Sequence, residues 1–264
     1  MAYELLKIEK RENGVAVVTM NQPETLNALG VGISRELRCA LTELEEDQGT
    51  RVIVLKGAGR AFSSGGNLKD MHQSLSGDAG KYMDELTREV YAAVDKLMVL
   101  DKPVIAAVHG FAYGAAFNLV LACDLAVCAE GTVFCESFIR LGLIPGGHAT
   151  TLLPRIVGMR RATELCLTGR DVSAEEALIM GLVNMVVPEK ELMEHALKMA
   201  DKLAETAPLA VRRTKKLLRA YYENTHEQQA EQERRTQIRM ASTRDFAEGV
   251  TAFVEKRKPK FVGE

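Results

Sequence analysis

Three times in the first 140 residues, a short uncharged run rich in β-branched residues is followed by a loop and then by a helix-like segment. The uncharged runs are residues 15–20, 52–55 and 103–108. After the first of them, apolar residues recur at helical spacing at positions 33, 37, 40, 41 and 44. Buried strands that alternate with helices form right-handed βαβ-type units. The repeat therefore predicts an α/β fold.

Length and charge narrow the class of protein further. The 264 residues carry 34 Lys+Arg against 36 Asp+Glu, and 47% are hydrophobic, which excludes a disordered or collagen-like chain. The length is enough for one large domain, or for a main domain with a smaller appendage. A formal net charge of −2 gives no electrostatic case for a nucleic-acid or membrane partner.

The N-terminal residues and the cysteines predict the compartment. Residues 1–10 have neither the apolar stretch of a secretory signal nor the Arg-rich bias of a transit peptide. No run approaches the roughly 18–20 apolar residues of a membrane span. The five cysteines include no Cys-x-x-Cys pair, and no His/Cys/Asp cluster has ligand spacing. We expect a cytoplasmic protein with reduced thiols and no metal site.

The character of the chain changes after about residue 150. Beyond residue 191 the sequence is highly charged and almost entirely helical in its periodicity. Phe246, Val250, Phe253 and Val254 line one face of the last helix, which Ser242 or Thr243 could cap. Such a helical tail either packs on its own core or supplies a subunit interface, and the periodicity leaves both possibilities open.

Two loops have the composition of ligand-binding turns. Residues 63–67 and 113–116 each follow an apolar strand, open a helix, and consist mostly of Gly, Ala and Ser. Small side chains let a ligand approach the backbone, where unpaired N–H groups at a helix start point towards it. Two converging amides would form an oxyanion hole. Ordinary turn chemistry after a strand explains the same glycines.

Other nucleotide and hydrolase motifs are absent. Gly57 and Gly59 begin like a dinucleotide fingerprint, but the third glycine is missing. The sequence contains neither a phosphate-binding loop of the Gly-x-x-x-x-Gly-Lys-Ser/Thr type nor a Gly-x-Ser-x-Gly elbow. These function classes are excluded.

Five segments, in order along the whole chain, resemble the crotonase family, the enoyl-CoA hydratase/isomerase superfamily. They are NQPETLNAL (21–29), GAGRAFSSGGNLK (57–69), KPVIAAVHGFAYGA (102–115), LGLIP (141–145) and EGVTAFVEKRKPKF (248–261). The resemblance implies a spiral of ββα units over residues 1–200. It also implies a helical region over residues 201–264 that builds homotrimers, often paired into hexamers. The substrate would be an acyl-CoA thioester, whose coenzyme A belongs to the substrate, with no other cofactor.

The same resemblance assigns roles to residues of this chain. The backbone amides of Gly66 and Ala115 would polarise the thioester carbonyl and stabilise an enolate. Contacts to the acyl-CoA would come from the two loops and from the C-terminal tail. Lys69, Phe253 and Lys256 would contact the CoA, and a neighbouring subunit could supply them. The implied binding residues are Leu26, Ala28, Ser64, Gly65, Asn67, Leu68, Lys69, Tyr113, Gly114, Phe138, Pro145, Gly146, His148, Phe253 and Lys256.

The chain departs from the family pattern at its acid positions. Family hydratases place two glutamates at what are here Asn118 and Phe138, and some isomerases place an aspartate at what is here Gly146. An amide can orient a water molecule but cannot take up a proton near neutral pH. An ordinary two-glutamate hydratase is therefore not expected.

Glu136 is the nearest remaining carboxylate. If residues 132–138 are extended, Glu136 and Phe138 leave the strand on the same face, and burial beside Phe134 would raise the pKa of Glu136. Glu136 could then act as a base from a displaced origin, unless the chain has already turned. His148, three residues after Pro145, is the next candidate.

Three readings follow from these residues. The first is an enoyl-CoA isomerase-like enzyme with one base. The second is an atypical hydratase in which Asn118 positions water and Glu136 acts alone. The third is a non-catalytic acyl-CoA binder that kept the fold and lost the acids. Other enolate chemistry stays open, as does the identity of the acyl chain.

Overall fold

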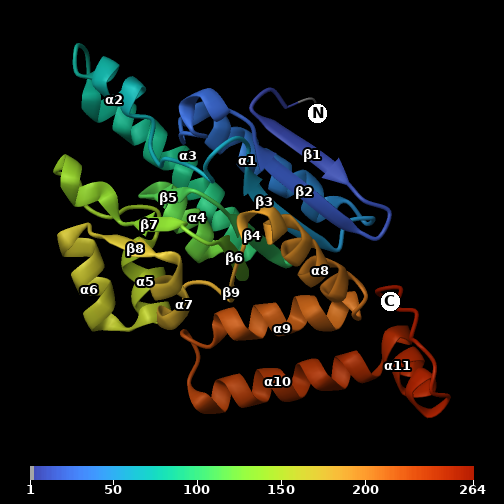
Figure 1. Cartoon of the computed structure of the whole chain (residues 1–264). Helices are drawn as coiled ribbons and strands as arrows, with labels where there is room; N and C mark the ends of the chain where they lie inside the picture. The colour runs from blue at the N-terminus through green and yellow to red at the C-terminus, as the bar shows by residue number, and fades with distance from the viewer. Residues whose placement is uncertain (1–2) are drawn as a thin grey trace.

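A six-stranded sheet runs through the centre of the molecule (Figure 1). The computed structural model describes residues 3–264. In spatial order the strands are β1 (Leu6–Lys10), β2 (Val15–Met20), β3 (Val52–Gly57), β4 (Val104–Val108), β6 (Leu125–Ala129) and β9 (Met185–Val187). Only β1 and β2 pair antiparallel, and every other pair is parallel. The predicted α/β class is confirmed.

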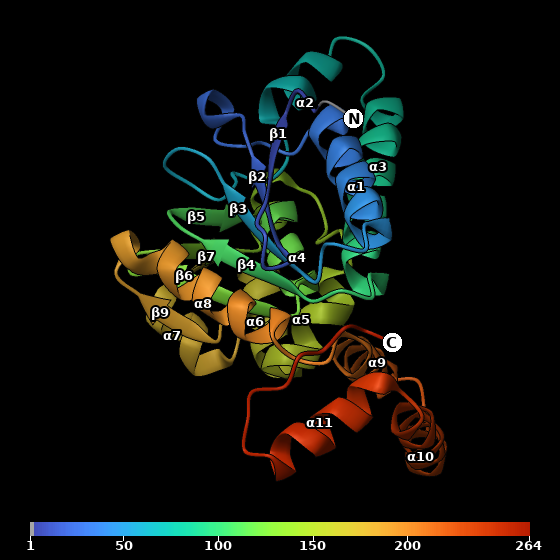
Figure 2. The same ribbon diagram turned by 90° about the vertical axis from the view of Figure 1, so that its right-hand side faces the viewer.

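Helices cover both faces of this sheet, which explains why β2, β4 and β6 lack charged residues. On one side lie α1 (Val31–Glu46), α3 (Ala79–Val99) and α4 (Ala115–Ala122), packed against one set of alternating strand residues. On the other side α8 (Leu192–Ala204) packs against the intervening residues (Figure 2). β2 and β4 are buried along their whole length.

A smaller sheet carries the second loop. Its order is β5 (Phe111–Tyr113), β7 (Val133–Cys135) and β8 (Asp171–Ser173), with β5 and β7 parallel and β7 and β8 antiparallel. A 3-10 turn, η2 (Ser137–Leu141), follows β7, and α5 (Ala149–Val157), α6 (Met159–Thr168) and α7 (Ala174–Met180) complete this part. The expectation that residues 132–138 are extended is therefore wrong after Cys135.

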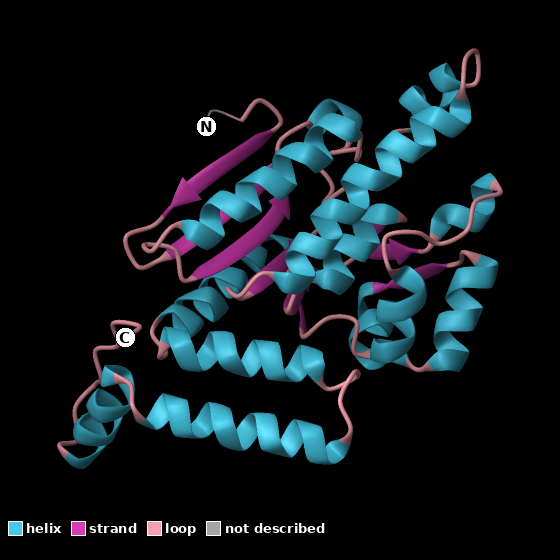
Figure 3. Cartoon of the chain, turned by 180° about the vertical axis from the view of Figure 1, so that it is seen from behind, coloured by secondary structure: helices cyan, strands magenta, loops and turns pink. Residues whose placement is uncertain are grey.

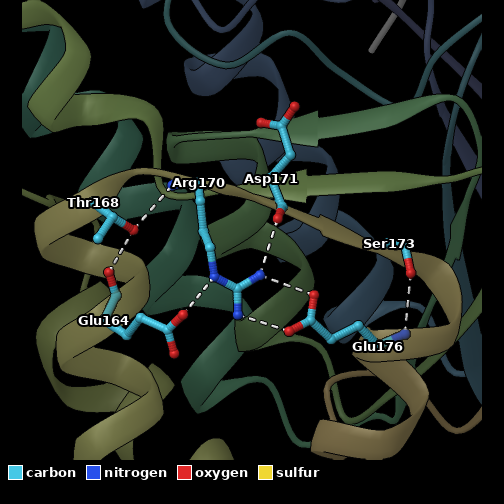
Figure 4. A network of polar contacts seen from close by, with 6 residues as sticks. All are labelled: Glu164, Thr168, Arg170, Asp171, Ser173 and Glu176. Carbon is cyan, nitrogen blue, oxygen red and sulfur yellow. Dashed lines mark hydrogen bonds and ion pairs between the residues drawn. The ribbon is translucent and has the colours of Figure 1, made fainter.

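Arg170 fastens the helices of this region to β8 (Figure 4). Its Nη1 and Nη2 donate to both carboxylate oxygens of Glu176 at 2.9 and 2.7 Å, and its Nε donates to Glu164 at 2.7 Å. Ser173 caps α7 by accepting from the Glu176 backbone. A planar guanidinium is suited to this fork geometry, so one side chain joins α6, β8 and α7.

The C-terminal residues form a separate helical layer below the sheets (Figure 3). It consists of α9 (Pro208–Ala220), α10 (His226–Ala241) and α11 (Arg244–Val254), and Thr243 caps α11. α9 is bound to the core through Asp124, which pairs with Lys215 at 2.7 Å and with Arg219 at 2.9 Å. The expected helical tail is present.

Two further observations concern the whole described chain. All five cysteines are free, and burial raises the pKa of Cys123, Cys128 and Cys135 to about 12, so these thiols are protonated. None of the helices within residues 3–264 has both the length and the apolar character needed to cross a bilayer.

Candidate active site

The two small-residue loops lie side by side because the first one continues the smaller sheet. Ser63 forms a parallel bridge with Ala112: the Ser63 amide donates to Phe111 O at 3.1 Å, and the Tyr113 amide donates to Ser63 O at 3.3 Å. Beyond this bridge the segments separate, because Gly66 pairs with Leu29 and Ala115 begins α4. The two loops stay in contact at Gly65, which packs against the Tyr113 carbonyl, so the amides of Gly66 and Ala115 each follow that point of contact.

Glycine is required where the loops touch. A Cβ on Gly65, which has φ +84°, would lie 2.3 Å from the Tyr113 carbonyl oxygen. Gly114 has φ +50° and precedes α4 as its N-cap, with the Ser137 hydroxyl 3.2 Å from where its Cβ would be. Left-handed backbone with no room for a side chain excludes other residues.

The amides of Gly66 and Ala115 are available to a ligand. Neither donates a hydrogen bond to another group in the described chain. Ala115 is the first residue of α4, so the helix dipole adds a positive potential at its N–H. Asn67 caps the short helix α2 (Leu68–Ser74) by accepting from the backbone of Lys69 and Asp70. Two free, adjacent amides can hold one oxyanion.

Asn27 holds the first loop in place, a role that the sequence pattern alone did not indicate. Its backbone is left-handed, its side chain is fully buried, and its Nδ2 donates to Ala58 O and Ala61 O at 2.8 and 2.9 Å. Ser64 N in turn donates to Leu26 O, and Leu29 N to Gly65 O. Leu26 and Ala28 therefore lie beside the loop. An asparagine after the turn η1 (Pro23–Thr25) was the available signal.

The three residues at the family's acid positions lie together next to Gly114. Asn118 is one turn into α4, and its Nδ2 donates to Gly146 O at 2.6 Å, while its Oδ1 is buried without a partner. The Phe138 ring packs between Gly114 and Gly146, at 3.6 and 3.8 Å from where their Cβ atoms would be. This side of the site therefore has no carboxylate.

Glu136 is a buried carboxyl group without a hydrogen-bond partner. It is 1% exposed, neither carboxyl oxygen is bonded, and burial raises its pKa to about 8. It follows Cys135, whose carbonyl accepts from Gly114 N at 2.7 Å. We expected Glu136 and Phe138 to share a strand face. They do not, because the chain turns at Ser137. The Glu136 side chain lies near Cys166 of α6, where its charge helps to raise the pKa of that thiol.

His148 is placed at the start of α5. Its backbone is left-handed, with φ 64°, and its Nε2 lies 2.7 Å from Asp95 Oδ1 on α3. That separation is an ion-pair distance, but the ring N–H is not directed for a hydrogen bond. The preceding residues, Pro145 and Gly146, are half-buried beside Phe138.

Other expected binding residues lie at the edge of this group or away from it. Leu68 and Lys69 are exposed on α2, and Tyr113 is half-buried with its ring 5.3 Å from that of Phe111. Phe253 and Lys256 belong to the C-terminal layer, far from the two loops of their own chain (Figure 1). Within residues 3–264, no three His, Cys, Asp or Glu side chains form a potential metal site.

Comparisons with known proteins agree with this architecture. The family model described as Enoyl-CoA hydratase/isomerase matches residues 10–264. A probable mitochondrial enoyl-CoA hydratase of Dictyostelium discoideum is 38% identical over 95% of this chain and 88% of that protein. The 1,2-epoxyphenylacetyl-CoA isomerase of Escherichia coli K12 is 36% identical over 96% of this chain and 97% of that protein. A crystal structure of enoyl-CoA hydratase from Bacillus anthracis superimposes with a TM-score of 0.94 at 34% identity, covering 99% of this chain and 100% of that one.

Proposed function

Because the chain belongs to the enoyl-CoA hydratase/isomerase family and is an enzyme of that family, we propose that it shifts the double bond of an enoyl-CoA thioester between the 2- and 3-positions. The amides of Gly66 and Ala115 hold the enolate oxygen, and Glu136 is the general acid/base. Relatives named hydratases and a relative named an isomerase match at similar identity. The choice between hydration and isomerisation therefore has to be argued from the side chains at the site of this chain.

The single observation that carries the proposal is the partnerless, buried carboxyl of Glu136. Among the described residues only Glu136 and Asp245 are buried carboxyl side chains, and Asp245 is bonded to the backbone of Val262 and Gly263 in the C-terminal layer. A carboxyl with a pKa of about 8 is matched to proton transfer near neutral pH.

Isomerisation needs only one such group. The ionised carboxylate takes a proton from C2 of a 3-enoyl thioester, and the electron pair delocalises over a dienolate whose oxygen faces the two amides. The resulting carboxylic acid exchanges its proton with solvent and delivers a proton to C4, or back to C2, and delivery to C4 leaves a 2-enoyl thioester and the original carboxylate. Each amide of such a hole is typically worth about 3–4 kcal/mol of activation free energy.

The residues at the customary acid positions argue against two-glutamate hydration. Asn118 has no proton-accepting group in its amide, Phe138 is apolar, and Gly146 has no side chain. Water would have to be deprotonated by Glu136 alone.

Hydration is the second candidate, and one observation favours it. Asn118 Oδ1 is a buried acceptor without a partner, and a water molecule could donate to it. Glu136 would then take the proton of that water and return it to C2. The product would be a 3-hydroxyacyl thioester, which differs from the isomer by the mass of one water molecule.

The coenzyme A portion arrives with the substrate, and the proposal includes no further cofactor. Ser64, Asn67 and Lys69 border the first loop, where the CoA would pass. The proposed assembly is a trimer, or a hexamer made of two trimers, in which the tail of one copy brings Phe253 and Lys256 to the CoA of another. A groove of about 950 Å³ between α9, α10 and α11 supports this, because Phe246 and Phe253 at its edge are 51% and 86% exposed. A cytoplasmic location remains a prediction.

Proton exchange in deuterated water tests the proposal. The protein is incubated with trans-3-hexenoyl-CoA, crotonyl-CoA and saturated hexanoyl-CoA, and products are analysed by mass spectrometry. We expect deuterium at C2 and C4 and a shifted double bond from the 3-enoyl thioester. Glu136→Gln should abolish this, whereas Glu130→Gln, a change at an exposed glutamate, should not. A hydrated product supports the second candidate, and binding without exchange would contradict both.

A further inference from the structure

Three polar side chains meet beyond Phe138, and the proposed reaction uses none of them. Tyr91 and Asp95 are one helical turn apart on α3, so they share a face of that helix. His148 approaches from the start of α5, with Nε2 2.7 Å from Asp95 Oδ1. The rings of Tyr91 and His148 lie with their centroids 5.2 Å apart, tilted by 59°. We call these three residues the α3–α5 cluster.

His148 occupies a backbone conformation that disfavours its side chain. Its φ of 64° is left-handed, and the preceding Gly147 has the same conformation at φ 57°. Few residues other than Gly adopt it, although His, like Asn and Asp, does so more often than most. In this conformation the imidazole of His148 contacts Asp95 and Tyr91. A strained residue next to a binding loop is a reason to look for a functional role.

The Tyr91 hydroxyl faces the same space as Phe138. A Cβ on Gly146 would lie 3.4 Å from Tyr91 Oη and 3.8 Å from Phe138 Cε1. The opposite edge of the Phe138 ring is 3.6 Å from where Gly114 would carry a Cβ, directly before the Ala115 amide. The Phe138 ring therefore lies between the backbone directly before the Ala115 amide and the Tyr91 hydroxyl. An acyl group bound at the two amides would have to extend past this ring to reach that hydroxyl.

That hydroxyl has no hydrogen-bond partner within residues 3–264, although Tyr91 is half-buried. The nearby carbonyl oxygen of Gly146 already accepts a hydrogen bond from the Asn118 side chain. A plain alkyl chain would displace water from the hydroxyl and leave it unpaired, which costs binding free energy. An oxygen on the acyl group would replace that water.

We propose that Tyr91 determines specificity by hydrogen-bonding an oxygen on the distal part of the acyl group, and that His148 and Asp95 are positioning residues that hold its ring. The preferred ligands are then hydroxyacyl- or oxoacyl-CoA thioesters rather than alkyl ones. The inference rests on the proposed function only for where the acyl group lies, and not for the reaction.

Binding of saturated thioesters tests this without turnover. Dissociation constants are measured by calorimetry for 4-hydroxybutyryl-, 5-hydroxypentanoyl- and 6-hydroxyhexanoyl-CoA, each against the alkyl thioester of the same carbon number. At one length the hydroxylated thioester should bind about three- to tenfold more tightly, the effect of one neutral hydrogen bond. Tyr91→Phe should remove that preference, by weakening the binding of the hydroxylated thioester and by tightening alkyl binding, since no hydroxyl is then left unpaired.

Two further variants and one control separate recognition from a purely structural role. His148→Gly suits the left-handed backbone while deleting the imidazole, and Asp95→Asn keeps the shape of the carboxylate; both should reduce the preference without removing alkyl binding. Tyr222→Phe is the matched control, because that hydroxyl donates to Arg155 O on another surface. It should leave the preference intact.

Equal binding of hydroxylated and alkyl thioesters at every length would overturn the inference. So would a Tyr91→Phe variant that weakens both classes equally. A preference for hydroxylated thioesters without isomerisation supports the inference and contradicts the proposed isomerase. Isomerisation without that preference supports the proposed isomerase and contradicts the inference. Failure of every thioester to bind contradicts both.

Discussion

The side-chain amide of Asn118 donates to the carbonyl oxygen of Gly146 at 2.6 Å. Two of the three positions at which the family pattern places carboxylates are thus bonded to each other, and the third, Phe138, packs beside them. This part of the site is a closed, neutral contact. This contact offers no group that can transfer a proton near neutral pH, and Glu136 is the buried carboxyl that we propose for that role.

Restoring both carboxylates should create hydration activity. In Asn118→Glu/Phe138→Glu the new groups face the loop before Ala115, and we expect crotonyl-CoA hydration to rise by about 10²-fold, a typical contribution of positioned acid/base groups. Absorbance loss of the enoyl thioester measures it. The matched control, Asn118→Gln/Phe138→Gln, has similar shape but cannot transfer protons. An equal rise in the control would contradict the expectation.

Isomerisation should accelerate as pH rises through about 8. The step that removes the C2 proton needs ionised Glu136, whose pKa is raised to about 8 by burial. Below that pH, kcat/KM for 3-hexenoyl-CoA should increase by about tenfold per pH unit and then level off. Glu136→Gln should lower kcat by about 10²–10⁴-fold. A flat profile for the wild-type protein would exclude Glu136 as the base.

The same substitution should stabilise the folded protein at alkaline pH. The pKa of Glu136 rises from 4.5 to about 8 on folding, so the folded state binds its proton more tightly. The free energy of unfolding therefore falls as pH rises from 4.5 to about 8. Glu136→Gln avoids that loss, and its advantage should reach on the order of 5 kcal/mol at pH 9 and vanish near pH 4. Urea unfolding at both pH values measures it, with Glu130→Gln as a control that shows no such difference.

Ala115→Pro should remove one oxyanion donor with little loss of stability. Proline is tolerated at the first position of a helix, where the missing N–H has no intrahelical acceptor. We expect kcat for 3-hexenoyl-CoA to fall by about 10²–10³-fold with KM nearly unchanged. Thermal unfolding checks that α4 is intact. A folded variant with full activity would show that this amide holds no charge in the transition state.

Phe253→Asp should prevent assembly through the C-terminal layer. Phe253 is 86% exposed on α11 beside the groove between the last three helices. A charge there would be desolvated on burial. Sedimentation velocity should show a shift from trimer or hexamer towards monomer, whereas Lys190→Asp, on the exposed side of the core, should not change the mass. An unchanged assembly in Phe253→Asp would place the interface elsewhere.

The strands and the two loops could be predicted from the sequence because local patterns decide them. Uncharged β-branched runs such as residues 15–20 fit a strand that is buried on both faces, and Gly65 and Gly114 are needed wherever two backbones meet this closely.

The end of β7 could not be predicted, because its partner decides it. The last pair of the register is Tyr113 with Cys135, after which Gly114 turns away into α4. Glu136 then caps the 3-10 turn Ser137–Leu141 in place of a longer strand, because β5 no longer runs beside it, although residues 136–138 continue the alternation in sequence. The α3–α5 cluster was hidden for a related reason: Tyr91 and His148 are distant in sequence, and only helix packing brings them together.

Asp124 also decides where this chain can be shortened. It follows α4 and accepts from Val104 N of β4, and its two cationic partners, Lys215 and Arg219, both come from α9. A chain ending at residue 200 would keep every strand but leave this half-buried carboxylate without either cation, at a cost of about 3 kcal/mol or more. Truncation, fusion or domain exchange at the edge of the helical layer should therefore retain α9. A cut in the turn between α9 and α10, for example after residue 224, leaves these pairs whole.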